Sequence, residues 1–468
     1  MKKSIIILSM SLAGLTASAQ ELRTTYFMET SSYRHEMNPA FLDAPYMSMP
    51  LILGNFNLGT TGNFGLSNFV YDMQPSWQGY GVDGRNLTTF MHPSVSAKDF
   101  LGGLKKNNRF SLNFKYQLFG FAFRGFGGTN LVEVNLRANA DAALPKSLFE
   151  FMKTTGQKSD YDISNLGVKA ESFVEVALGH SHKINDKLTV GAKAKVLLGA
   201  GRAELQADNL HLHLNEDYWG INGRVNATAS MMNTTLEFKD ESHNDPATGR
   251  PQVDDIDEVK AGLSGFGLAL DLGATYQLLP DLKLSAALTD LGFISWNNTH
   301  KASSSGEWKF EGFKEDVYAG GHNTGSNKIG DQLEAIGDDM EDIFSVYYDG
   351  KGKETKALAA TLNLGAEYTL PAYRKLRFGF LYTSRFAGRY SFHQGMLSAT
   401  VRPVKWFEAS ANCAMHSGGF SGGVVIDLHA PHFNFFVGAD RIVGKLSKDY
   451  IPLNNANTSV SLGMSVPF

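Results

Sequence analysis

The sequence predicts an all-β fold, an antiparallel transmembrane β-barrel of about 14 strands with an N-terminal segment in its lumen and a few short helices. Three observations support this fold class: a long central hairpin with one apolar face, an export signal at the N-terminus, and a final alternating strand that ends in an aromatic residue. Together they indicate an exported chain whose strands face lipid on one side and water on the other.

The central hairpin lies in residues 263–296. From residue 266 to residue 278, an apolar side chain alternates with a small or polar one. A period of two over this length predicts a strand with one apolar face and one small, polar face. On this hairpin alone, a lipid-facing barrel strand and a strand of a water-soluble sandwich fit equally well. The apolar positions are Phe266, Leu268, Leu270, Leu272, Ala274, Tyr276 and Leu278.

The return strand of the hairpin follows a tight turn at residues 279–281. A three-residue turn pairs Leu278 with Leu282, so that apolar side chains meet across the two strands. After Leu288 the apolar side chains move from even to odd positions. This change of phase predicts a β-bulge near residues 289–290.

The first residues predict a cleaved signal peptide, residues 1–19. A basic start precedes an apolar run at residues 4–15, and residues 17–19 form an A-x-A cleavage site, with Gln20 first in the mature chain. Without the two lysines of the signal, 41 of the 43 basic residues remain against 47 acidic residues, a net charge of −6. This balance argues against nucleic acid as a partner. Cys413 is the single cysteine, so no disulfide can form within the chain.

The C-terminal strand carries the third observation. Residues 459–468 alternate small polar and apolar side chains, and Phe468 is the last residue. This ending resembles the signal that outer-membrane barrel proteins present to their assembly machinery, and Pro467 is a departure that a strand end tolerates. We therefore expect the bacterial cell outer membrane as the location, with outer-membrane lipid and the assembly machinery as partners.

The mature chain is expected to have two parts, a hatch-like or plug-like segment at residues 20–95 and the barrel at residues 96–468. The first part does not alternate cleanly, and its Asn38-Pro39-Ala40 sequence predicts a turn. An ordinary turn is the alternative to a hatch motif here, because such turns occur in proteins of every class.

Strands follow one another through the remainder of the chain. Long excursions at residues 239–260 and 297–355 contrast with short turns elsewhere, an asymmetry that is usual for outer-membrane barrels. Helical spacing predicts short helices at residues 96–106, 144–153 and 331–344.

The residues at 33–41, 120–124, 184–191 and 265–296 resemble an uncharacterised Bacteroidota-type outer-membrane β-barrel family, a domain of unknown function. That family is distantly similar to FadL-type fatty-acid channels and to barrels associated with type IX secretion. The resemblance implies a barrel whose N-terminal segment folds into the lumen as a hatch. The apolar pockets in which FadL-type channels bind fatty acids do not map onto positions here, so the resemblance implies an architecture and no particular substrate.

Two carboxylates are the main charged candidates. Asp271 and Asp290 fall nearly opposite each other in the hairpin and should point inward or lie at the bulge. The cationic partners expected for them are Arg124, Arg377 or Arg385. The functional interpretation is a charged constriction or hatch contact that steers solutes, and the structural interpretation is a salt bridge that holds the hatch.

Other chemistry is poorly supported by the sequence. The pairs His180/His182 and His211/His213 have no carboxylate or cysteine at a matching offset, and the acidic residues in 239–260 lack the spacing of a Ca²⁺ loop. Catalytic motifs of hydrolases and metalloproteases are absent from the sequence. We therefore expect no enzyme activity, no cofactor and no metal.

The expected function is passive uptake of a small or hydrophobic solute by diffusion through the barrel. The alternative is a non-conducting outer-membrane scaffold or shuttle for partner proteins in secretion or surface assembly. An open lumen lined by small residues favours the channel, whereas a lumen plugged throughout by residues 20–95 favours the scaffold.

Overall fold

The computed structural model describes residues 22–49, 54–72, 87–154, 157–214, 219–260, 262–304, 307–310, 345–417, 419–441 and 458–468. The predicted signal peptide and the predicted helix at residues 331–344 lie outside the described residues.

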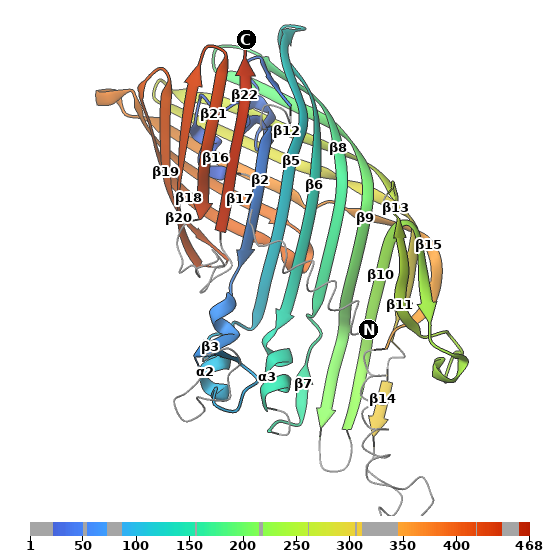
Figure 1. Cartoon of the computed structure of the whole chain (residues 1–468). Helices are drawn as coiled ribbons and strands as arrows, with labels where there is room; N and C mark the ends of the chain where they lie inside the picture. The colour runs from blue at the N-terminus through green and yellow to red at the C-terminus, as the bar shows by residue number, and fades with distance from the viewer. Residues whose placement is uncertain are drawn as a thin grey trace, which may run out of the picture.

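Fourteen strand positions form a closed antiparallel ring, which confirms the predicted barrel (Figure 1). The final strand, β22, closes the ring against β1 and β2, which share the first position and pair with β5 on their other side. The wall strands are β1 (Tyr46–Ser48), β2 (Asn55–Gly62), β5 (Asn107–Gly125), β6 (Gly128–Pro145), β8 (Gly167–Lys183), β9 (Leu188–Leu214), β12 (Gly265–Leu279), β13 (Leu282–Ser303), β16 (Ala360–Thr369), β17 (Leu376–Phe386), β18 (Phe392–Val404), β19 (Phe407–His416), β20 (Gly419–Ala430), β21 (Phe433–Arg441) and β22 (Thr458–Pro467).

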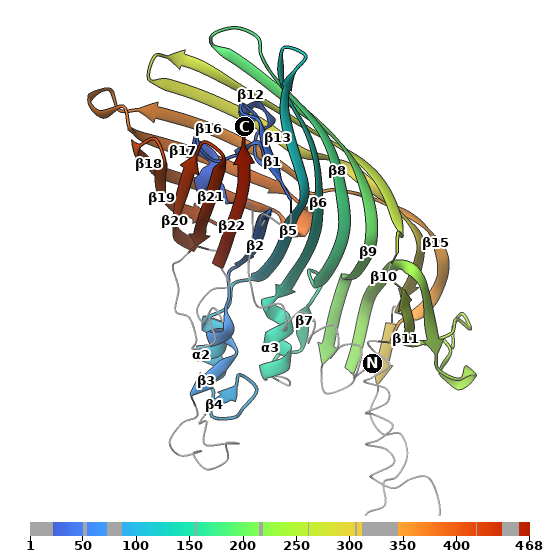
Figure 2. The ribbon, with the colours of Figure 1, turned by 45° about the horizontal axis from the view of Figure 1, so that its top comes forward.

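Part of the sheet continues beyond the ring. The first part of β9 pairs with β12, and its second part pairs with β10, so the sheet extends past the barrel on that side (Figure 2). The additional strands are β10 (Trp219–Phe238), β11 (Val253–Lys260), β14 (Glu307–Phe310), β15 (Tyr347–Ala357), β7 (Asp160–Asp162) and the separate pair β3 (Val70–Asp72) and β4 (Leu87–Thr89).

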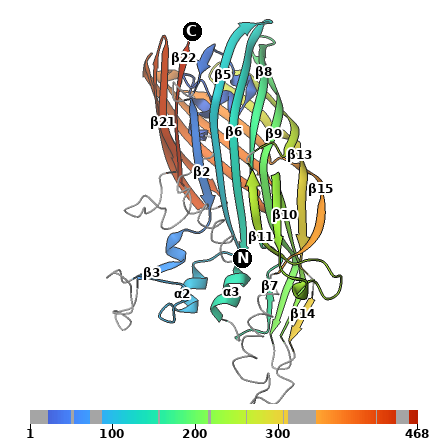
Figure 3. The ribbon, with the colours of Figure 1, turned by 45° about the vertical axis from the view of Figure 1, so that its right-hand side comes forward.

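The helical elements among the described residues are short. Two α-helices, α2 (Ala97–Gly102) and α3 (Lys146–Thr154), lie beside each other at the end of the barrel opposite the C-terminus (Figure 3). No helix among the described residues combines the length and apolar character needed to cross a membrane. The 3₁₀ turns are η1 (Arg23–Phe27), η2 (Arg34–Glu36), η3 (Pro39–Phe41), η5 (Leu66–Asn68), η8 (Glu241–His243), η9 (Pro371–Tyr373) and η10 (Gly388–Tyr390).

The outer surface of the wall is apolar and the inner surface is polar. In β12, the side chains of Phe266, Leu268 and Leu272 are 51%, 48% and 45% exposed, whereas Asp271 between them is fully buried. This arrangement reverses that of a water-soluble sandwich, in which the large apolar side chains would fill the interior. The predicted faces of the central hairpin are therefore confirmed, and the hairpin belongs to a barrel rather than to a water-soluble sandwich.

The pairing within the hairpin follows the predicted phase with one difference. Leu272 lies opposite Leu288 and Leu270 opposite Leu291, so the predicted bulge is confirmed at the residues between them. Asp290 within it has a φ of 59°, in the left-handed region that Asp tolerates better than most residues. The turn is shorter than predicted, because Leu279 rather than Leu278 pairs with Leu282.

The two ends of the barrel differ in their connections. At the end that carries the C-terminus, successive strands are joined by short turns such as Phe126-Gly127, where both residues have positive φ and form a hairpin turn that matches the strand twist. At the opposite end, the strands β2 and β5 are joined by the long connection that contains α2. We call these the short-turn end and the long-loop end.

The wall begins earlier than the expected boundary at residue 96. Residues 46–48 and 55–62 pair with both β5 and β22 and complete the ring, so these parts of the expected hatch segment belong to the wall. The sequence did not reveal β1 and β2 as wall strands, because both are short and the alternation of apolar and polar side chains does not continue from one to the other.

Several smaller predictions are also decided. Helix α2 lies within the predicted 96–106 and is capped by the Ser96 hydroxyl, while α3 lies close to the predicted 144–153. The acidic segment at residues 239–260, predicted as a loop, instead ends in strand β11, which pairs with β10. Asp255 and Asp257 therefore belong to a strand rather than to a loop.

Candidate functional site

The lumen at the short-turn end is occupied by residues 22–43, which we call the lumen segment (Figures 1 and 3). Tyr26, Met28, His35 and Asn38 are all fully buried, although the segment contains only 3₁₀ turns and irregular backbone. Two apolar clusters join the segment to inward side chains of the wall, for example Tyr33 with Phe436. The segment is therefore a packed part of the barrel interior.

Glycines on the inner face of the wall make room for this segment. A Cβ atom added to Gly273 would lie 2.1 Å from Asn38 Oδ1, and one added to Gly191 would lie 2.3 Å from the carbonyl carbon of Pro39. A Cβ atom added to Gly379 would lie 2.2 Å from the Cδ2 atom of the Phe27 ring. The small residues on this face thus serve as sockets for the lumen segment, since backbone and side chains approach more closely than a methyl group would allow.

The Asn38-Pro39-Ala40 sequence is the main contact between the lumen segment and the central hairpin. Asn38 Oδ1 accepts a hydrogen bond from the backbone N–H of Ala40 at 3.0 Å and so caps η3. Asn38 Nδ2 donates to the backbone carbonyls of Ala274 and Ala286 at 3.3 and 3.4 Å. The predicted turn thus exists, and it lies against β12 and β13.

Wall carboxylates hold the backbone of the lumen segment. Glu408 accepts hydrogen bonds from the Thr30 N–H at 3.0 Å and from the Thr30 hydroxyl at 2.6 Å. Asp440 accepts from the backbone N–H groups of Arg23 and Thr24 at 2.5 and 2.9 Å. These bonds satisfy backbone donors that the irregular lumen segment leaves unpaired inside the barrel.

Arg124 and Arg377, two of the predicted lumen charges, contact the lumen segment. Arg377 forms an ion pair with Glu29 at 2.6 Å and another with Glu408. Burial raises the pKa of Glu29, but the charges of Arg377, Arg34 and Lys283 together outweigh it and hold this pKa below its usual value. Arg124 donates to the backbone carbonyl of Asp43 at the end of the segment.

His35 is a fully buried imidazole in the lumen segment. Its Nε2 lies 2.7 Å from the Tyr46 hydroxyl, and the two rings are stacked. Burial, together with the charge of Lys193, lowers the pKa of His35 well below its ordinary value. The ring is therefore neutral at pH 7.

Asp271 and Asp290 lie together, as predicted, but with other partners. Asp290 forms a bidentate pair with Arg137 at 2.8 and 2.9 Å, and Lys195 contacts Asp290 at 2.8 Å and Asp271 at 2.7 Å. Glu175 completes the cluster through Arg137 at 2.9 Å. All five residues belong to the wall, so the cluster joins strands to one another and does not hold the lumen segment.

The sequence analysis missed Arg137, Lys195 and Glu175. The sequence contained a signal for them. Lys193 and Lys195 lie at odd positions, like the inward-facing Gly191 of the same strand, and Glu133 and Arg137 lie on one face of β6. Charged residues on the small-residue face of a barrel strand are lumen residues.

A second set of contacts crosses the lumen near the long-loop end. Arg385 of β17 lies 3.3 Å from Asp141 of β6, six positions away on the ring of fourteen. Arg389 of η10 donates to the carbonyl of Leu166 at 2.8 Å, and Arg109 of β5 donates to the carbonyl of Ser391 at 3.1 Å. We call these three contacts the cross-lumen clasp, because each joins nearly opposite sides of the barrel.

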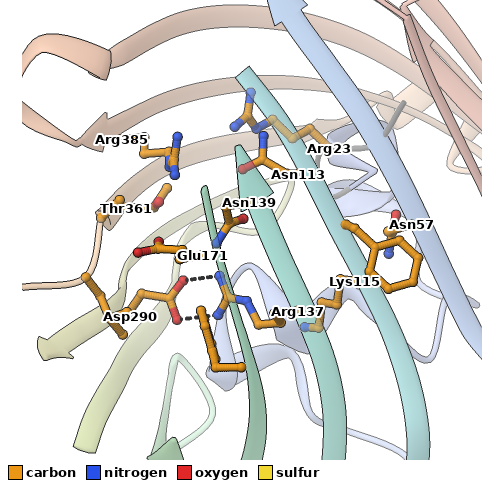
Figure 4. Close-up of a pocket in the computed structure, with 14 residues that line it drawn as sticks. Arg23, Asn57, Asn113, Lys115, Arg137, Asn139, Glu171, Asp290, Thr361 and Arg385 are labelled. Carbon is orange, nitrogen blue, oxygen red and sulfur yellow. Dashed lines mark hydrogen bonds and ion pairs between the residues drawn. The ribbon is translucent and has the colours of Figure 1, made fainter. Parts of the chain in front are cut away.

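A small cavity lies between the lumen segment and the clasp (Figure 4). Its volume is about 60 Å³, and Arg23 of the lumen segment and Arg385 of the clasp both line it. A larger cavity of about 180 Å³ lies beside the clasp and is lined by Arg109, Tyr390 and Phe392 among others. The lining of both contains charged and amide or hydroxyl side chains, as expected of a lumen in contact with water.

The remaining candidates are separate from this site. Phe468 is 58% exposed and stacks on Phe121, and its role as an assembly signal stays a prediction. His180 and His182 stack on each other next to the β8–β9 turn, and His213 pairs with Asp160. Within the described ranges, no three His, Cys, Asp or Glu side chains are grouped so as to hold a metal ion.

Comparison with known proteins identifies a family and several similar structures. Residues 39–440 match a family of unknown function, DUF5723. The chain is similar to the toluene transporter TbuX of Ralstonia pickettii at 10% identity, with 93% of this chain and 92% of that chain covered and a TM-score of 0.40. It is similar to the toluene transporter TodX of P. putida at 9% identity, with 92% of each chain covered and a TM-score of 0.38. No curated protein matches the chain.

Proposed function

We propose that this chain, which belongs to the DUF5723 family of unknown function, is an outer-membrane β-barrel channel that admits a small polar solute by passive diffusion. The observation that carries the proposal is the closed wall with large apolar side chains outside and charged side chains inside. A closed barrel leaves no unpaired strand edge, which is the condition for a β-structure to span lipid.

The wall is long enough for this location. A transmembrane strand needs about 9–11 residues, and β12 and β17 have 15 and 11. The expected signal peptide would export the chain. Short turns at one end and long connections at the other match the inner and outer sides of known outer-membrane barrels, so the lumen segment would face the periplasm.

The lumen favours a polar solute over a hydrophobic one. The cavity between the lumen segment and the clasp is lined by charged and amide side chains such as Arg385, Glu171 and Asn113 (Figure 4). A hydrophobic solute would have to remove water from these groups without replacing their hydrogen bonds. Passage requires both the clasp and the lumen segment to move, because both cross the path between the two ends.

One observation favours the second candidate, a non-conducting scaffold for partner proteins. The glycine sockets fit the lumen segment so closely that the segment belongs to the folded wall, which is the arrangement expected of a permanently closed barrel. The two candidates differ in whether ions pass through the barrel.

Conductance in planar bilayers separates them. Three proteins are compared: the full mature chain, a chain that lacks residues 22–43, and the variant Arg389→Gln, which removes one clasp contact. The deletion must end before Tyr46, because β1 and β2 complete the wall. We expect discrete conductance steps that become larger or more frequent in both altered proteins. Absence of conductance in all three, with a folded barrel shown by circular dichroism, would favour the scaffold.

A further inference from the structure

We infer that the larger cavity beside the clasp binds a small hydroxylated carboxylate through Arg109, and that this binding releases one contact of the clasp. Binding as such stands on the cavity, whereas the conclusion that this carboxylate is the transported solute rests on the proposed function. The cavity has a volume of about 180 Å³. Among the described residues that line it, Arg109 is the only one with a charge, and the others carry hydroxyl, amide or aromatic side chains or are glycine.

The cavity lies on the long-loop side of the clasp. Strand β5 begins at the long-loop end, and Arg109 and Ser111 near its start line this cavity. Asn113, the next inward position of β5, lines the small cavity beyond the clasp. The Ser111 hydroxyl donates to Asp141, the clasp partner of Arg385, at 2.6 Å. A solute that enters from the long-loop end therefore reaches Arg109 before it reaches the small cavity.

Arg109 differs from the other lumen cations in the partner that it has. Its Nη1 donates to the Ser391 carbonyl at 3.1 Å, and the described part of the chain gives its side chain no other hydrogen bond and no carboxylate partner. In contrast, Arg137, Lys195 and Arg385 each contact a carboxylate oxygen at 2.8 to 3.3 Å. The charge of Arg109 is therefore available to a ligand without the loss of an ion pair.

A carboxylate is the chemical group that matches this arginine. A guanidinium presents its N–H groups in a fork that fits the two oxygens of a carboxylate, and such charge-assisted bonds are stronger than a bond to a neutral carbonyl. One cation balances the single charge of a carboxylate, whereas a phosphate monoester carries about two charges at pH 7. A cationic solute would meet the Arg109 charge with no carboxylate among the described lining residues.

The size and the polar lining of the cavity favour hydroxyl groups on the ligand. The Asn107 side chain has no hydrogen bond to any described residue, and the Ser417 hydroxyl makes only long contacts with the His393 backbone, at 3.3 and 3.5 Å. A water molecule needs about 10–15 Å³ of such space, so the cavity holds a solute of about a dozen non-hydrogen atoms. Gluconate, and sorbitol as its uncharged counterpart with the same carbon chain, are therefore the probes.

Binding acts on the clasp because the same guanidinium holds Ser391. This residue follows η10 in the connection between β17 and β18, and Arg389 of η10 makes a second clasp contact, to the Leu166 carbonyl. A carboxylate binds Arg109 more tightly when the Ser391 carbonyl has left it. A ligand shifts an equilibrium toward the state that it binds better, so the carboxylate favours the state in which this clasp contact is open.

Calorimetric titration of each probe into the detergent-solubilised mature protein tests the site. The variants are Arg109→Gln and, as the matched control, Arg374→Gln, which breaks an ion pair with Asp281 at the short-turn end. A charge-assisted bond exceeds a neutral one by about 1.4 kcal/mol, or ~10-fold in affinity. We expect gluconate to bind at least ~10-fold more tightly than sorbitol to the wild type and the control, and Arg109→Gln to lose this difference.

A second variant covers the case in which Arg109→Gln does not fold. Ser417→Asp places a negative charge on an exposed lining residue, and we expect it to weaken gluconate binding and to leave sorbitol binding unchanged. Equal binding of the two probes by the wild type would overturn the site. An affinity for gluconate that both lining variants leave unchanged would overturn it as well.

Conductance in planar bilayers tests the release of the clasp. We expect gluconate, and not sorbitol, to raise the frequency of conductance steps in the wild type. The Arg109→Gln variant should show more frequent steps without gluconate and no response to it. Gluconate binding without any conductance would overturn the channel and leave the site standing, whereas conductance without gluconate binding would do the reverse. Binding that leaves the step frequency unchanged would overturn the release of the clasp.

Discussion

Replacement of Gly273 by alanine should release the lumen segment while leaving the wall intact. The new Cβ would lie 2.1 Å from Asn38 Oδ1 and 2.9 Å from Pro39 Cδ, both closer than such atoms approach in folded proteins. Asn38 would have to move, and its bonds to Ala40 N–H and to the Ala274 carbonyl would lengthen from 3.0 and 3.3 Å. Overpacking costs about 1–3 kcal/mol, and weakened hydrogen bonds add about 1 kcal/mol. The docking free energy should therefore fall by about 2–4 kcal/mol.

Thiol labelling measures this change. Ser31, which is 4% exposed and belongs to the lumen segment, is replaced by cysteine in a background where the exposed Cys413 is replaced by alanine. When opening is fast and reversible, the labelling rate follows the open population. A change of about 2–4 kcal/mol predicts labelling ~30- to ~1,000-fold faster.

The matched control is Gly352→Ala in β15, where an added Cβ meets nothing within 4 Å. It should label at the rate of the parent protein. If Gly273→Ala labels no faster than Gly352→Ala, the segment is not held by its fit against β12, and the socket argument is wrong.

Three further predictions follow from the charges and faces of the barrel. Asp290→Asn removes one partner from a buried cluster and should destabilise the barrel by about 3–5 kcal/mol. The control, Asp281→Asn, breaks an ion pair in an exposed turn and should cost under about 1 kcal/mol. Urea unfolding in detergent measures the stability of both variants. Leu268→Arg on the outer face should weaken folding into lipid vesicles by about 2–4 kcal/mol if that residue lies at the bilayer centre, and a value near zero would contradict the lipid-facing assignment. For His35, burial lowers the pKa of the docked ring, so the released segment takes up the proton more readily. Docking should therefore be strongest above the unperturbed pKa of about 6.5 and weaken as pH falls below it. The weakening should appear as faster labelling at Ser31→Cys, and the His35→Gln variant should lose this pH dependence.

The sequence by itself determined the faces of the strands and the place of the bulge. Alternation between residues 266 and 278 is a local property, because successive side chains of any strand point to opposite sides. The change of phase after Leu288 required an extra residue, and the structure has it at Asp290. The same local rule shows that Asp271 points inward, as it does.

Only the tertiary structure decided which groups meet inside the barrel. Arg137 of β6, Lys195 of β9 and Asp290 of β13 come together because ring closure brings their strands around one lumen, and no periodicity within a strand encodes that distance. Arg385 reaches Asp141 only because the two walls face each other at that level. Strand registers over hundreds of residues set these contacts, so the residue types were visible in the sequence while their partners were not.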